Sequence, residues 1–550
     1  MLSIHFILPE GPVRGASPVY RPVLPRGVLQ VARAAELAGW EATVLDGYSA
    51  PHLLQAYYQA LSGEVAVFPG AMELPDLVGL SVHGPPAIGP AMAIAARLRE
   101  IMPSLPLLFG GQLANADAEL LLPLLPERSI LFCGDGDRNI GSVMEEALAA
   151  TGKARLIRHT GVHPWRSLPD LDLLLPKYTD YFAEQDFEYH LETQIGCPYR
   201  CFHCGTGRKG LYARTMMRPI EAIQRELDQV VAWAKKADLH YPRLWITDET
   251  FGADKEHARA FCDALIARPE QWRWRAQSRA DVVSEDLVKL MRKAGCERLA
   301  FGVEIPNDAG LDLLGKREGM KIVKEAFSIC RSHGVSPEAI IVVGTPGDST
   351  QPGEFLDALD LLEAESVQSY IYHPIPGSPW WKRYGGNLRG GSGSLRLWSD
   401  LDFHSPPLDA SPAETERAVV AFLALQVWRP KSERIGPTMR SKDLVKCYKC
   451  SLDLKADRVF AHQPACIDIY RLCVDGKTFF LATNSKEAQV LQVDLTEHRN
   501  LYTSLFSVDG EVDFSLCPRC VIEKRLYNRS PMVNRHLGGE ANLSSPLALE

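Results

Sequence analysis

The stretch TQIGCPYRCFHCGTG (residues 193–207) places three cysteines within eight residues, in the spacing C-x3-C-x2-C. Glycine and proline punctuate it, which predicts a loop, and the segment YHLETQIG has the pattern of a strand that runs into it. Thiolate sulfur suits zinc and iron–sulfur clusters, but a closed zinc site needs a fourth ligand. His203 is poorly placed for that role, because it is wedged between two of the cysteines. The set Cys197, Cys201 and Cys204 therefore favours a [4Fe–4S] cluster with one iron left open.

The chain has 550 residues, so its length alone predicts about three domains. Apolar residues make up 46% and charged residues 23%, as is typical of a folded protein in water. The formal net charge of −8 gives no overall basic surface, which disfavours nucleic acid and anionic membranes as partners. The sequence contains no run of about 18 apolar residues, so it predicts no membrane-spanning helix. The first residues resemble a strand more than a signal peptide, so we expect a cytoplasmic protein.

Short apolar runs alternate with amphipathic segments over residues 1–150, which predicts a parallel, Rossmann-like sheet. Residues 151–188 are rich in proline, aspartate and leucine and are expected to form a linker. Over residues 189–385 six predicted strands alternate with helices, which favours a partial (β/α)6 barrel. Residues 386–550 open with a glycine-rich break, then show a helical pattern near 412–428 and hairpin-like segments. The expected fold class is α/β with a small α+β C-terminal domain.

The cysteine loop, placed after the first strand of a predicted partial barrel, resembles the signature of radical S-adenosylmethionine (SAM) enzymes. The resemblance spans about residues 190–380. It implies that the three cysteines hold a [4Fe–4S] cluster and that its open iron chelates the amino and carboxylate groups of SAM. An electron from the cluster would then split SAM and give a 5′-deoxyadenosyl radical. The resemblance also implies a flavodoxin- or ferredoxin-type electron donor.

Further motifs of the resemblance follow the predicted strands: WITDETF (245–251), SRAD (278–281), FGVE (301–304), VVGTPGDS (342–349) and PIPGSP (374–379). A barrel presents functional groups at these strand ends, and LGKR (314–317) is expected on the helix after FGVE. The resemblance implies that Arg279 approaches the SAM carboxylate and Glu304 the ribose, that Gly344 admits the adenine, and that Asp248 lines the methionine end. Each charged residue has an alternative, an ion pair that only supports the strand end.

Glycine-rich segments end three predicted strands of residues 1–150: SVHGPP (81–86), GGQLAN (110–115) and GDGD (134–137). Alone, each is a common turn, but together they resemble the cobalamin-binding domain of the cobalamin-dependent branch, the class B methyltransferases. The expected cofactor contacts are Ser81, His83, Gly110, Gly111, Gly134 and Gly136. That domain often carries a cobalt-ligating histidine after its first strand, and the corresponding loop here has none. His83 is the candidate contact below the cobalt, or else a surface histidine. The motifs of nucleotide-binding domains are missing.

CYKC (447–450) and CPRC (517–520) form two C-x2-C knuckles. Each knuckle supplies two thiolates, so Cys447, Cys450, Cys517 and Cys520 are expected to bind structural zinc together. A second iron–sulfur cluster is the alternative. The isolated residues Cys133, Cys262, Cys296 and Cys330 are predicted to be small buried core residues.

These resemblances imply a methyltransferase that moves a methyl group from methylcobalamin to an unactivated carbon or phosphorus of a small molecule or peptide. Relatives that catalyse ring contraction or cyclisation without methylation are one alternative. Another is an enzyme that modifies RNA or a peptide gripped by the zinc domain. The tRNA methylthiotransferase branch is disfavoured, because its N-terminal domain brings three cysteines and residues 1–150 contain only Cys133. The motifs of the SAM pocket argue against a sensor without turnover.

Overall fold

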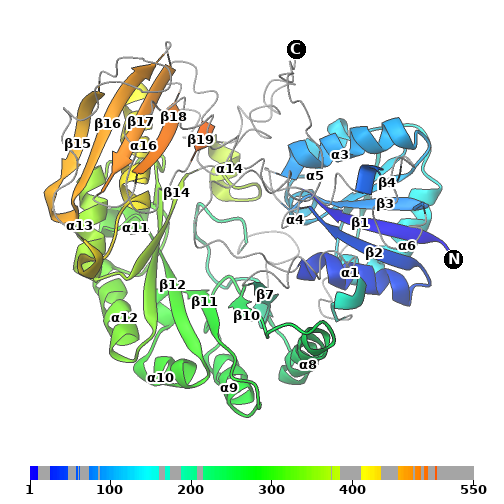
Figure 1. Ribbon diagram of the computed structural model, residues 1–550, viewed down its shortest axis with the longest axis horizontal. Coiled ribbons are helices and arrows are strands. Elements are labelled where there is room, and N and C mark those ends of the chain that lie inside the picture. Colours follow the sequence, from blue (N-terminus) through cyan, green and yellow to red (C-terminus); the bar gives the residue numbers. More distant parts are fainter. Residues whose placement is uncertain are drawn as a thin grey trace.

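The computed structural model describes residues 1–9, 25–47, 57–59, 61, 74–83, 87–159, 168–173, 187–206, 215–372, 374–384, 411–434, 456–474, 477–484, 488–493 and 502–504. Within these ranges the chain forms two parallel sheets, one antiparallel sheet and a two-stranded ribbon. The two parallel sheets belong to separate units that lie on opposite sides of the molecule (Figure 1).

The N-terminal sheet has six parallel strands in the order β2-β1-β3-β4-β5-β6. These are β1 (Ser3–Leu8), β2 (Glu41–Asp46), β3 (Leu77–Ser81), β4 (Leu107–Gly110), β5 (Ser129–Cys133) and β6 (Arg155–Arg158). Helices α1 (Arg26–Leu37) and α6 (Gly136–Leu148) pack against each other, and α3 (Ile88–Ile101) covers the opposite face (Figure 1). The strand order reverses between β1 and β3, and doubly wound sheets bind ligands at the carboxyl edge there.

The sheet extends beyond the predicted boundary at residue 150. β6 lies inside the segment that was expected to be linker, and it pairs in parallel with β5. Its sequence RLIR has an arginine at each end and only two apolar residues between them. Charged side chains are common in edge strands. That short pattern gave no apolar run, so the expectation of a linker from residue 151 was wrong for these four residues.

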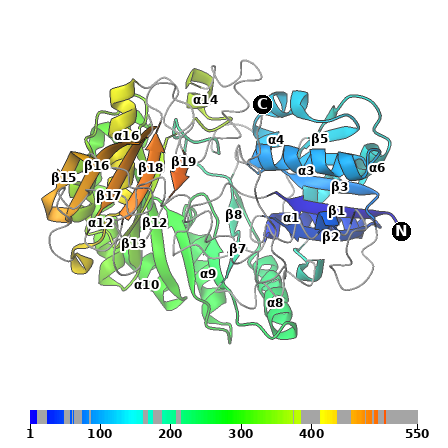
Figure 2. The same cartoon turned by 45° about the horizontal axis from the view of Figure 1, so that its top comes forward.

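The second parallel sheet has the order β7-β10-β11-β12-β13-β14, so neighbours in the sheet follow one another along the chain. Its strands are β7 (Glu188–Leu191), β10 (Arg243–Ile246), β11 (Trp274–Ser278), β12 (Cys296–Glu304), β13 (Ser336–Val343) and β14 (Ser366–Ile371). The intervening helices include α8 (Ile220–Lys236), α9 (Lys255–Ile266), α10 (Glu285–Lys293), α12 (Met320–Ser332) and α13 (Pro352–Leu362). β7 is an edge strand and lies on the side of this unit that faces α1 (Figure 2).

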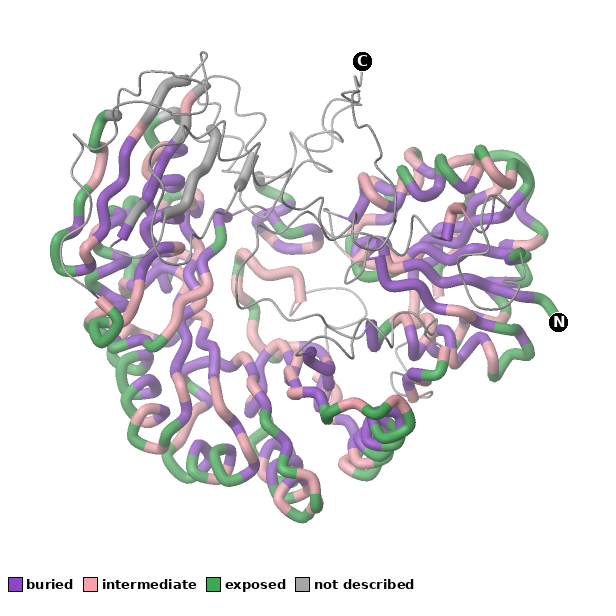
Figure 3. Tube along the Cα trace, viewed as in Figure 1, coloured by how far each residue is buried: buried purple, intermediate pink, exposed green. Residues whose placement is uncertain are grey.

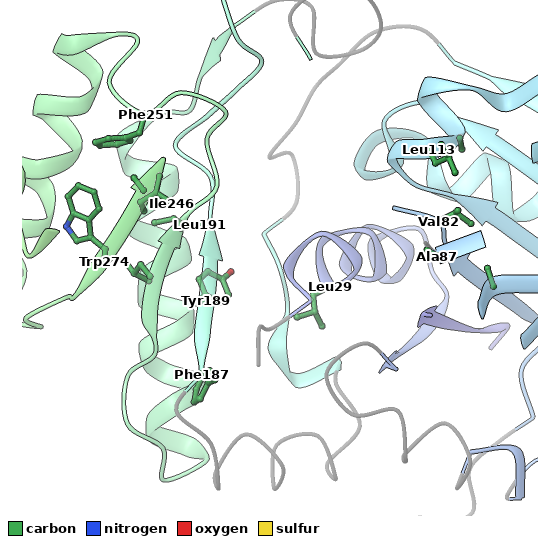
Figure 4. Packing of buried hydrophobic residues seen from close by; sticks show 14 of the residues in the cluster. Leu29, Val82, Ala87, Leu113, Phe187, Tyr189, Leu191, Ile246, Phe251 and Trp274 are labelled. Atoms are coloured by element: carbon green, nitrogen blue, oxygen red, sulfur yellow. The ribbon is translucent and has the colours of Figure 1, made fainter. Parts of the chain in front are cut away.

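Helix α8 buries one amphipathic face. Pro219 is its N-cap residue, and Ile223, Leu227, Val230 and Val231 are buried on one face. The buried strands of both units carry the core, whereas the exposed residues lie mainly on the outer helices (Figure 3). One connected set of buried apolar side chains reaches from Leu29 and Val82 in the N-terminal unit to Tyr189 and Trp274 in the second unit (Figure 4). It also contains all four isolated cysteines, as predicted.

The third unit is an antiparallel sheet with the order β15-β16-β17-β18-β19. It comprises β15 (Ala456–His462), β16 (Ile467–Val474), β17 (Lys477–Thr483), β18 (Ala488–Val493) and β19 (Tyr502–Ser504). Helix α16 (Pro412–Gln426) begins at Ser411 with a capping box and contacts both β14 and this sheet. The four knuckle cysteines lie outside the described residues. In the part of the chain that is described, no helix is both long and apolar enough to cross a membrane.

Candidate active site

The start of the cysteine loop is clamped by Asp248, which follows β10. Its Oδ1 accepts hydrogen bonds from the backbone N–H groups of Thr193 (2.8 Å) and Gln194 (3.1 Å), and its Oδ2 accepts from the Thr193 hydroxyl. Burial raises the pKa of Asp248 to about 7, although these hydrogen bonds oppose the shift. Its oxygens thus bind the strand that leads to Cys197. This geometry favours the supporting alternative over a direct contact with SAM.

The three cysteine thiols each meet a polar group from the second sheet or from the loop itself. Cys197 Sγ lies 3.4 Å from the Thr250 hydroxyl, Cys201 Sγ accepts from Arg279 Nη1 at 3.9 Å, and Cys204 Sγ accepts from the backbone N–H of Thr206. Burial raises the pKa of the Cys201 thiol, whereas the charges of Lys316 and Arg279 lower it. Metal ligation requires thiolates, so these two cations favour the ligating form.

Arg279 keeps its charge because it is paired from several sides. Its guanidinium donates two hydrogen bonds to Asp281, both 2.9 Å long, and lies over the Tyr199 ring at 3.9 Å from the ring centre. Burial alone would lower the pKa of Arg279, but the hydrogen bonds that it donates to Asp281 and the charge of Glu318 raise this pKa above its usual value. Arg279 therefore places a permanent positive charge beside the cysteine loop.

Two residues that the sequence analysis did not assign complete this charged site. Lys316 and Glu318 are both buried, and Lys316 Nζ lies 3.1 Å from Glu318 Oε1 and 3.6 Å from Glu304 Oε1. The LGKR motif was expected on a helix, which is wrong: it lies in the connection between α11 (Asp308–Leu313) and α12. Gly315 has positive φ there, and a backbone of that kind ends a helix. The charged run KRE (316–318) in the sequence was the available signal.

Glu304 ends β12 in an unusual backbone conformation. Its φ is 59°, a region that few residues other than glycine adopt, and its carboxylate lies 3.8 Å from His203 Nε2. Gly302 makes room for it, because a Cβ at that position would lie 2.5 Å from Glu304 Oε1. The strand end thus aims one carboxylate at the cysteine loop. Gly344 directly follows β13 with a φ of 72°, at the same edge of the sheet.

The residues present fit a bound cluster and an organic ligand. Glu318 Oε2, Thr345 Oγ1 and His203 Nδ1 are buried without a hydrogen-bond partner, and native proteins rarely leave such atoms unsatisfied. His203 lies in the cysteine loop itself, Glu318 lies between α11 and α12, and Thr345 follows β13. Across the ranges given above, no group of three or more histidine, cysteine, aspartate or glutamate residues is arranged around a single ion. In a cluster, each thiolate would bind its own iron atom.

The predicted cobalamin contacts gather at the carboxyl edge of the N-terminal sheet. Ser81 ends β3 and pairs with Gly110 at the end of β4, while Gly134 follows β5. His83 lies two residues beyond Ser81 and is partly buried. Residues 84–86 lie outside the described ranges, as does nearly all of the loop after β1. The three motifs therefore come together as expected, while their role towards a ligand stays a prediction.

The four glycines at this edge, Gly110, Gly111, Gly134 and Gly136, differ in how much space surrounds them. A Cβ on Gly111 would lie 2.6 Å from the Val82 carbonyl oxygen, and its φ is 113°. A Cβ on Gly134 would lie 2.6 Å from the Phe132 ring, and one on Gly136 would lie 3.0 Å from Val31. Packing within the fold thus accounts for these three. A Cβ on Gly110 would make only an ordinary contact, 3.9 Å from the Phe132 carbonyl oxygen, so packing among the described residues does not require a glycine there.

The two carboxyl edges are linked at two places. Trp381 in α14 (Pro379–Tyr384), which follows β14, donates a hydrogen bond of 3.0 Å to Asp117, which follows β4. Arg26 at the start of α1, the helix after β1, pairs with Glu226 in α8 and with Glu192 directly after β7. Each link joins segments that follow the carboxyl ends of strands in both sheets. The two edges where ligands are expected therefore face each other.

Residues 191–362, which contain the cysteine loop and the strand-end motifs, match a family described as the radical SAM superfamily. Residues 191–362 form a domain of the radical SAM superfamily. The cysteine loop and the motifs after β10, β11, β12 and β13 are thus parts of a radical SAM domain. This confirms the family resemblance that the sequence motifs indicated.

Curated relatives carry out more than one reaction. The anaerobic magnesium-protoporphyrin IX monomethyl ester cyclase of Synechocystis sp. is 24% identical, over 66% of this chain and 72% of that protein. An uncharacterized methyltransferase of Pyrococcus horikoshii is 22% identical, over 56% and 69%. The hopanoid C-3 methylase of Methylococcus capsulatus is 23% identical, over 56% and 60%. Each identity is too low to transfer a reaction.

Solved structures share the arrangement of the first two units. TsrM from Kitasatospora setae, a radical SAM methyltransferase solved with cobalamin and a [4Fe-4S] cluster, aligns with a TM-score of 0.53 and 17% identity, over 71% of this chain and 79% of that one. The cobalamin-dependent radical enzyme OxsB with aqua-cobalamin aligns with a TM-score of 0.50 and 15% identity, over 72% and 56%. At these identities the likeness is one of fold.

Proposed function

We propose that this protein is a cobalamin-dependent radical SAM enzyme, and that it transfers a methyl group to an unactivated carbon or phosphorus atom of a small-molecule or peptide substrate. When bound, the cluster and SAM would supply a 5′-deoxyadenosyl radical, and cobalamin would supply the methyl group. The observation that carries this proposal is the pair of facing carboxyl edges. Two cofactors that act on one substrate must share one space, and the links through Arg26 and Trp381 hold the two edges together.

The chain's own residues supply positioning and charge in this proposal. Cys197, Cys201 and Cys204 would hold the cluster. Arg279 and Lys316 would balance the negative charge of the thiolates, because both cations are buried beside the loop. The Glu304 carboxylate, held beside His203, is placed to accept hydrogen bonds from a sugar. At the N-terminal edge, Ser81, His83 and Gly110 are the proposed contacts for cobalamin, because Ser81 and Gly110 pair at the ends of β3 and β4 and packing among the described residues does not require a glycine at position 110.

A ring-forming reaction is the second candidate. One observation favours it: the relative from Synechocystis, which has the largest coverage of the three described, is a cyclase. The two candidate reactions share the same cofactors, so metal content does not distinguish them. Incubation with SAM that carries a deuterated methyl group distinguishes them, since only a methyltransferase moves the label into product. RNA modification through a zinc domain ranks lower, because it rests on knuckles outside the described residues.

Metal analysis of the anaerobically purified protein is the first test. Growth with hydroxocobalamin should yield about four irons and one cobalt per chain, with the visible spectrum of an iron–sulfur protein. Iron without cobalt would retain the radical chemistry and remove the methyl carrier from the proposal.

Replacement of Cys201 by alanine should abolish the release of 5′-deoxyadenosine under reducing conditions and leave cobalt content unchanged. A Cys201→Ala protein that still cleaves SAM would contradict the cluster assignment.

The C-terminal knuckles have a separate test. We propose that Cys447, Cys450, Cys517 and Cys520 bind about one zinc per chain. Replacement of Cys447 and Cys520 by serine should then lower zinc content and thermal stability before it affects SAM cleavage. Unchanged zinc content would refute this assignment. A total of about eight irons without zinc would point instead to a second cluster and to a role in electron transfer from the flavodoxin- or ferredoxin-type donor.

A further inference from the structure

Arg26 crosses from the N-terminal unit into the radical SAM domain and is buried there. Its guanidinium donates to both oxygens of Glu226, from Nε at 2.7 Å and from Nη2 at 3.0 Å. A third nitrogen, Nη1, donates to Glu192 Oε2 at 3.1 Å. Arg26 is 5% exposed and Glu226 is 1% exposed. A fork of this kind fixes both the distance and the angle between its partners, which a single contact does not.

The contacts of Arg26 continue into both units. On the N-terminal side, Gln30 accepts from Arg26 at 3.3 Å and donates to Asp137 at 2.9 Å. Asp137 belongs to the GDGD motif, one of the three loops predicted to contact cobalamin. The network therefore reaches the carboxyl edge of the N-terminal sheet through two side-chain contacts.

On the other side, Glu226 accepts from the Tyr189 hydroxyl at 2.7 Å and pairs with the buried Arg218. Arg218 Nη1 donates to the backbone carbonyl of Glu192 at 3.2 Å. Glu192 directly precedes Thr193, the residue that Asp248 clamps at the start of the cysteine loop. The network thus ends on the strand segment that leads into the cluster site.

We propose that Arg26 is a positioning residue that sets the separation of the cobalamin and cluster sites, because it ties the GDGD loop to the strand that enters the cysteine loop. This inference rests on the proposed two-cofactor function. Arg26 touches neither the cysteines nor the strand-end motifs of the SAM pocket in any contact described above. It acts through Gln30 and Asp137 on one side and through Glu192 and Glu226 on the other.

Hydrogen exchange of the full chain without cofactors tests the link itself. Arg26→Gln should raise exchange both at residues 188–195 and at residues 134–140, and Arg26→Lys should do so less, because it keeps the charge but loses the fork. Arg33→Gln is the matched control. Arg33 lies on the same helix, but its pairs with Glu36 and Asp170 are at the surface. Equal exchange in Arg26→Gln and Arg33→Gln would overturn the proposed link, and Arg26→Lys decides the matter if the glutamine variant does not fold.

Turnover of the loaded protein tests the positioning role. A displacement of about 1 Å can cost on the order of 100-fold in rate. We therefore expect Arg26→Gln to bind cluster and SAM as the parent does, to release 5′-deoxyadenosine at a similar rate, and to form about 10- to 100-fold less product. The distribution of magnetic dipolar couplings between the reduced cluster and cobalt(II) should also become wider, because the distance between the two sites is less well fixed. Unchanged product per SAM cleaved, with unchanged coupling, would overturn the role. A parent protein that binds no cobalt would refute the proposed function, while hydrogen exchange would still decide the link.

Discussion

Asp248 and Arg279 are both buried, but the surroundings of Asp248 disfavour its charged form, whereas the surroundings of Arg279 favour its charged form. Asp248 has hydrogen-bond donors around it and no cation within an ion-pair distance among the described residues, so burial dominates and raises its pKa to about 7. Arg279 has carboxylates on two sides, so it stays charged. At the scale of single residues, one group therefore supports the chain and the other supplies charge to the cluster site.

Replacement of Asp248 should separate hydrogen bonding from charge. Asp248→Asn keeps an acceptor for the Thr193 and Gln194 N–H groups, so we expect little loss of stability. Asp248→Ala leaves both donors unpaired, and should cost about 1–3 kcal/mol and weaken iron retention. Because the folded-state pKa is raised, this group's contribution to stability is greatest below about pH 4 and declines as the pH rises through 7. Urea unfolding at pH 5 and pH 8 checks this, and a decline that persists in Asp248→Asn would contradict it.

Replacement of Arg279 should weaken SAM binding rather than cluster assembly. Arg279→Lys keeps a positive charge but loses the two-pronged contact with Asp281 and the stacking on Tyr199. We expect the dissociation constant for SAM to rise about tenfold, which corresponds to about 1.4 kcal/mol. Titration of the reconstituted protein with SAM measures it, with iron content as the control. Loss of iron with unchanged SAM affinity would instead assign Arg279 to the cluster alone.

Sequence motifs located the residues at strand ends, because a strand followed by a short polar motif is a local pattern. Arg279, Glu304 and the cysteines were found in that way. Lys316 and Glu318 escaped assignment, because their burial depends on a connection whose path the local pattern does not define. The pair Arg26 and Glu226 had no signal at all, since 200 residues separate the two and neither belongs to a motif. Contacts of that range depend on how whole units pack.

At the scale of elements, the ends of β3 and β4 show which glycines the fold itself requires. The Val82 N–H donates to the Gly110 carbonyl at 2.7 Å, which draws the two strand ends together. Gly111 follows with positive φ and sits against the Val82 backbone. Periodicity in the sequence predicted these strands well, because buried parallel strands are continuous apolar runs. It missed β6, because an edge strand needs no such run.

Neighbouring glycines at the end of β4 should respond differently to the same change. Gly111→Ala forces a Cβ into the Val82 carbonyl and a strained backbone, so we expect a loss of about 1–3 kcal/mol. Gly110→Ala makes only an ordinary contact with the Phe132 carbonyl oxygen, so stability should change by less than about 0.5 kcal/mol while cobalamin uptake falls. Thermal unfolding and cobalt analysis compare the two. Full cobalamin uptake by Gly110→Ala would remove Gly110 from the proposed site.

At the scale of the whole molecule, the buried ion pair between Arg26 and Glu226 should make the association of the two units depend on pH. Burial tends to raise the pKa of Glu226, but Arg26 and Arg218 outweigh it and lower this pKa to about 2. A carboxyl whose pKa is lowered on folding stabilises the fold above its ordinary pKa, and that stabilisation is lost as the pH falls towards the folded-state value. The link should therefore be intact at neutral pH and fail in acid.

Acid unfolding should reveal that dependence. We expect the difference in stability between the parent protein and Glu226→Gln to be constant above about pH 4.5 and to shrink as the pH falls to about 2. Urea unfolding at several pH values in that window gives the difference directly. A difference that does not change with pH would mean that the Glu226 charge contributes no stability. Glu36→Gln on the exposed surface of α1 is the matched control.

The Arg26 fork also has a consequence for chimaeras. Exchange of domains between related enzymes is a common route to altered specificity, and it assumes that each domain carries its own half of every contact. Here Arg26 and Gln30 would travel with the N-terminal unit, whereas Glu192, Arg218 and Glu226 would stay behind. A recipient without Arg26 would then bury Glu226 with one arginine instead of two, and Glu192 would lose its ion pair with Arg26. Compatible donors should therefore be chosen by the residue at the start of this helix rather than by overall identity.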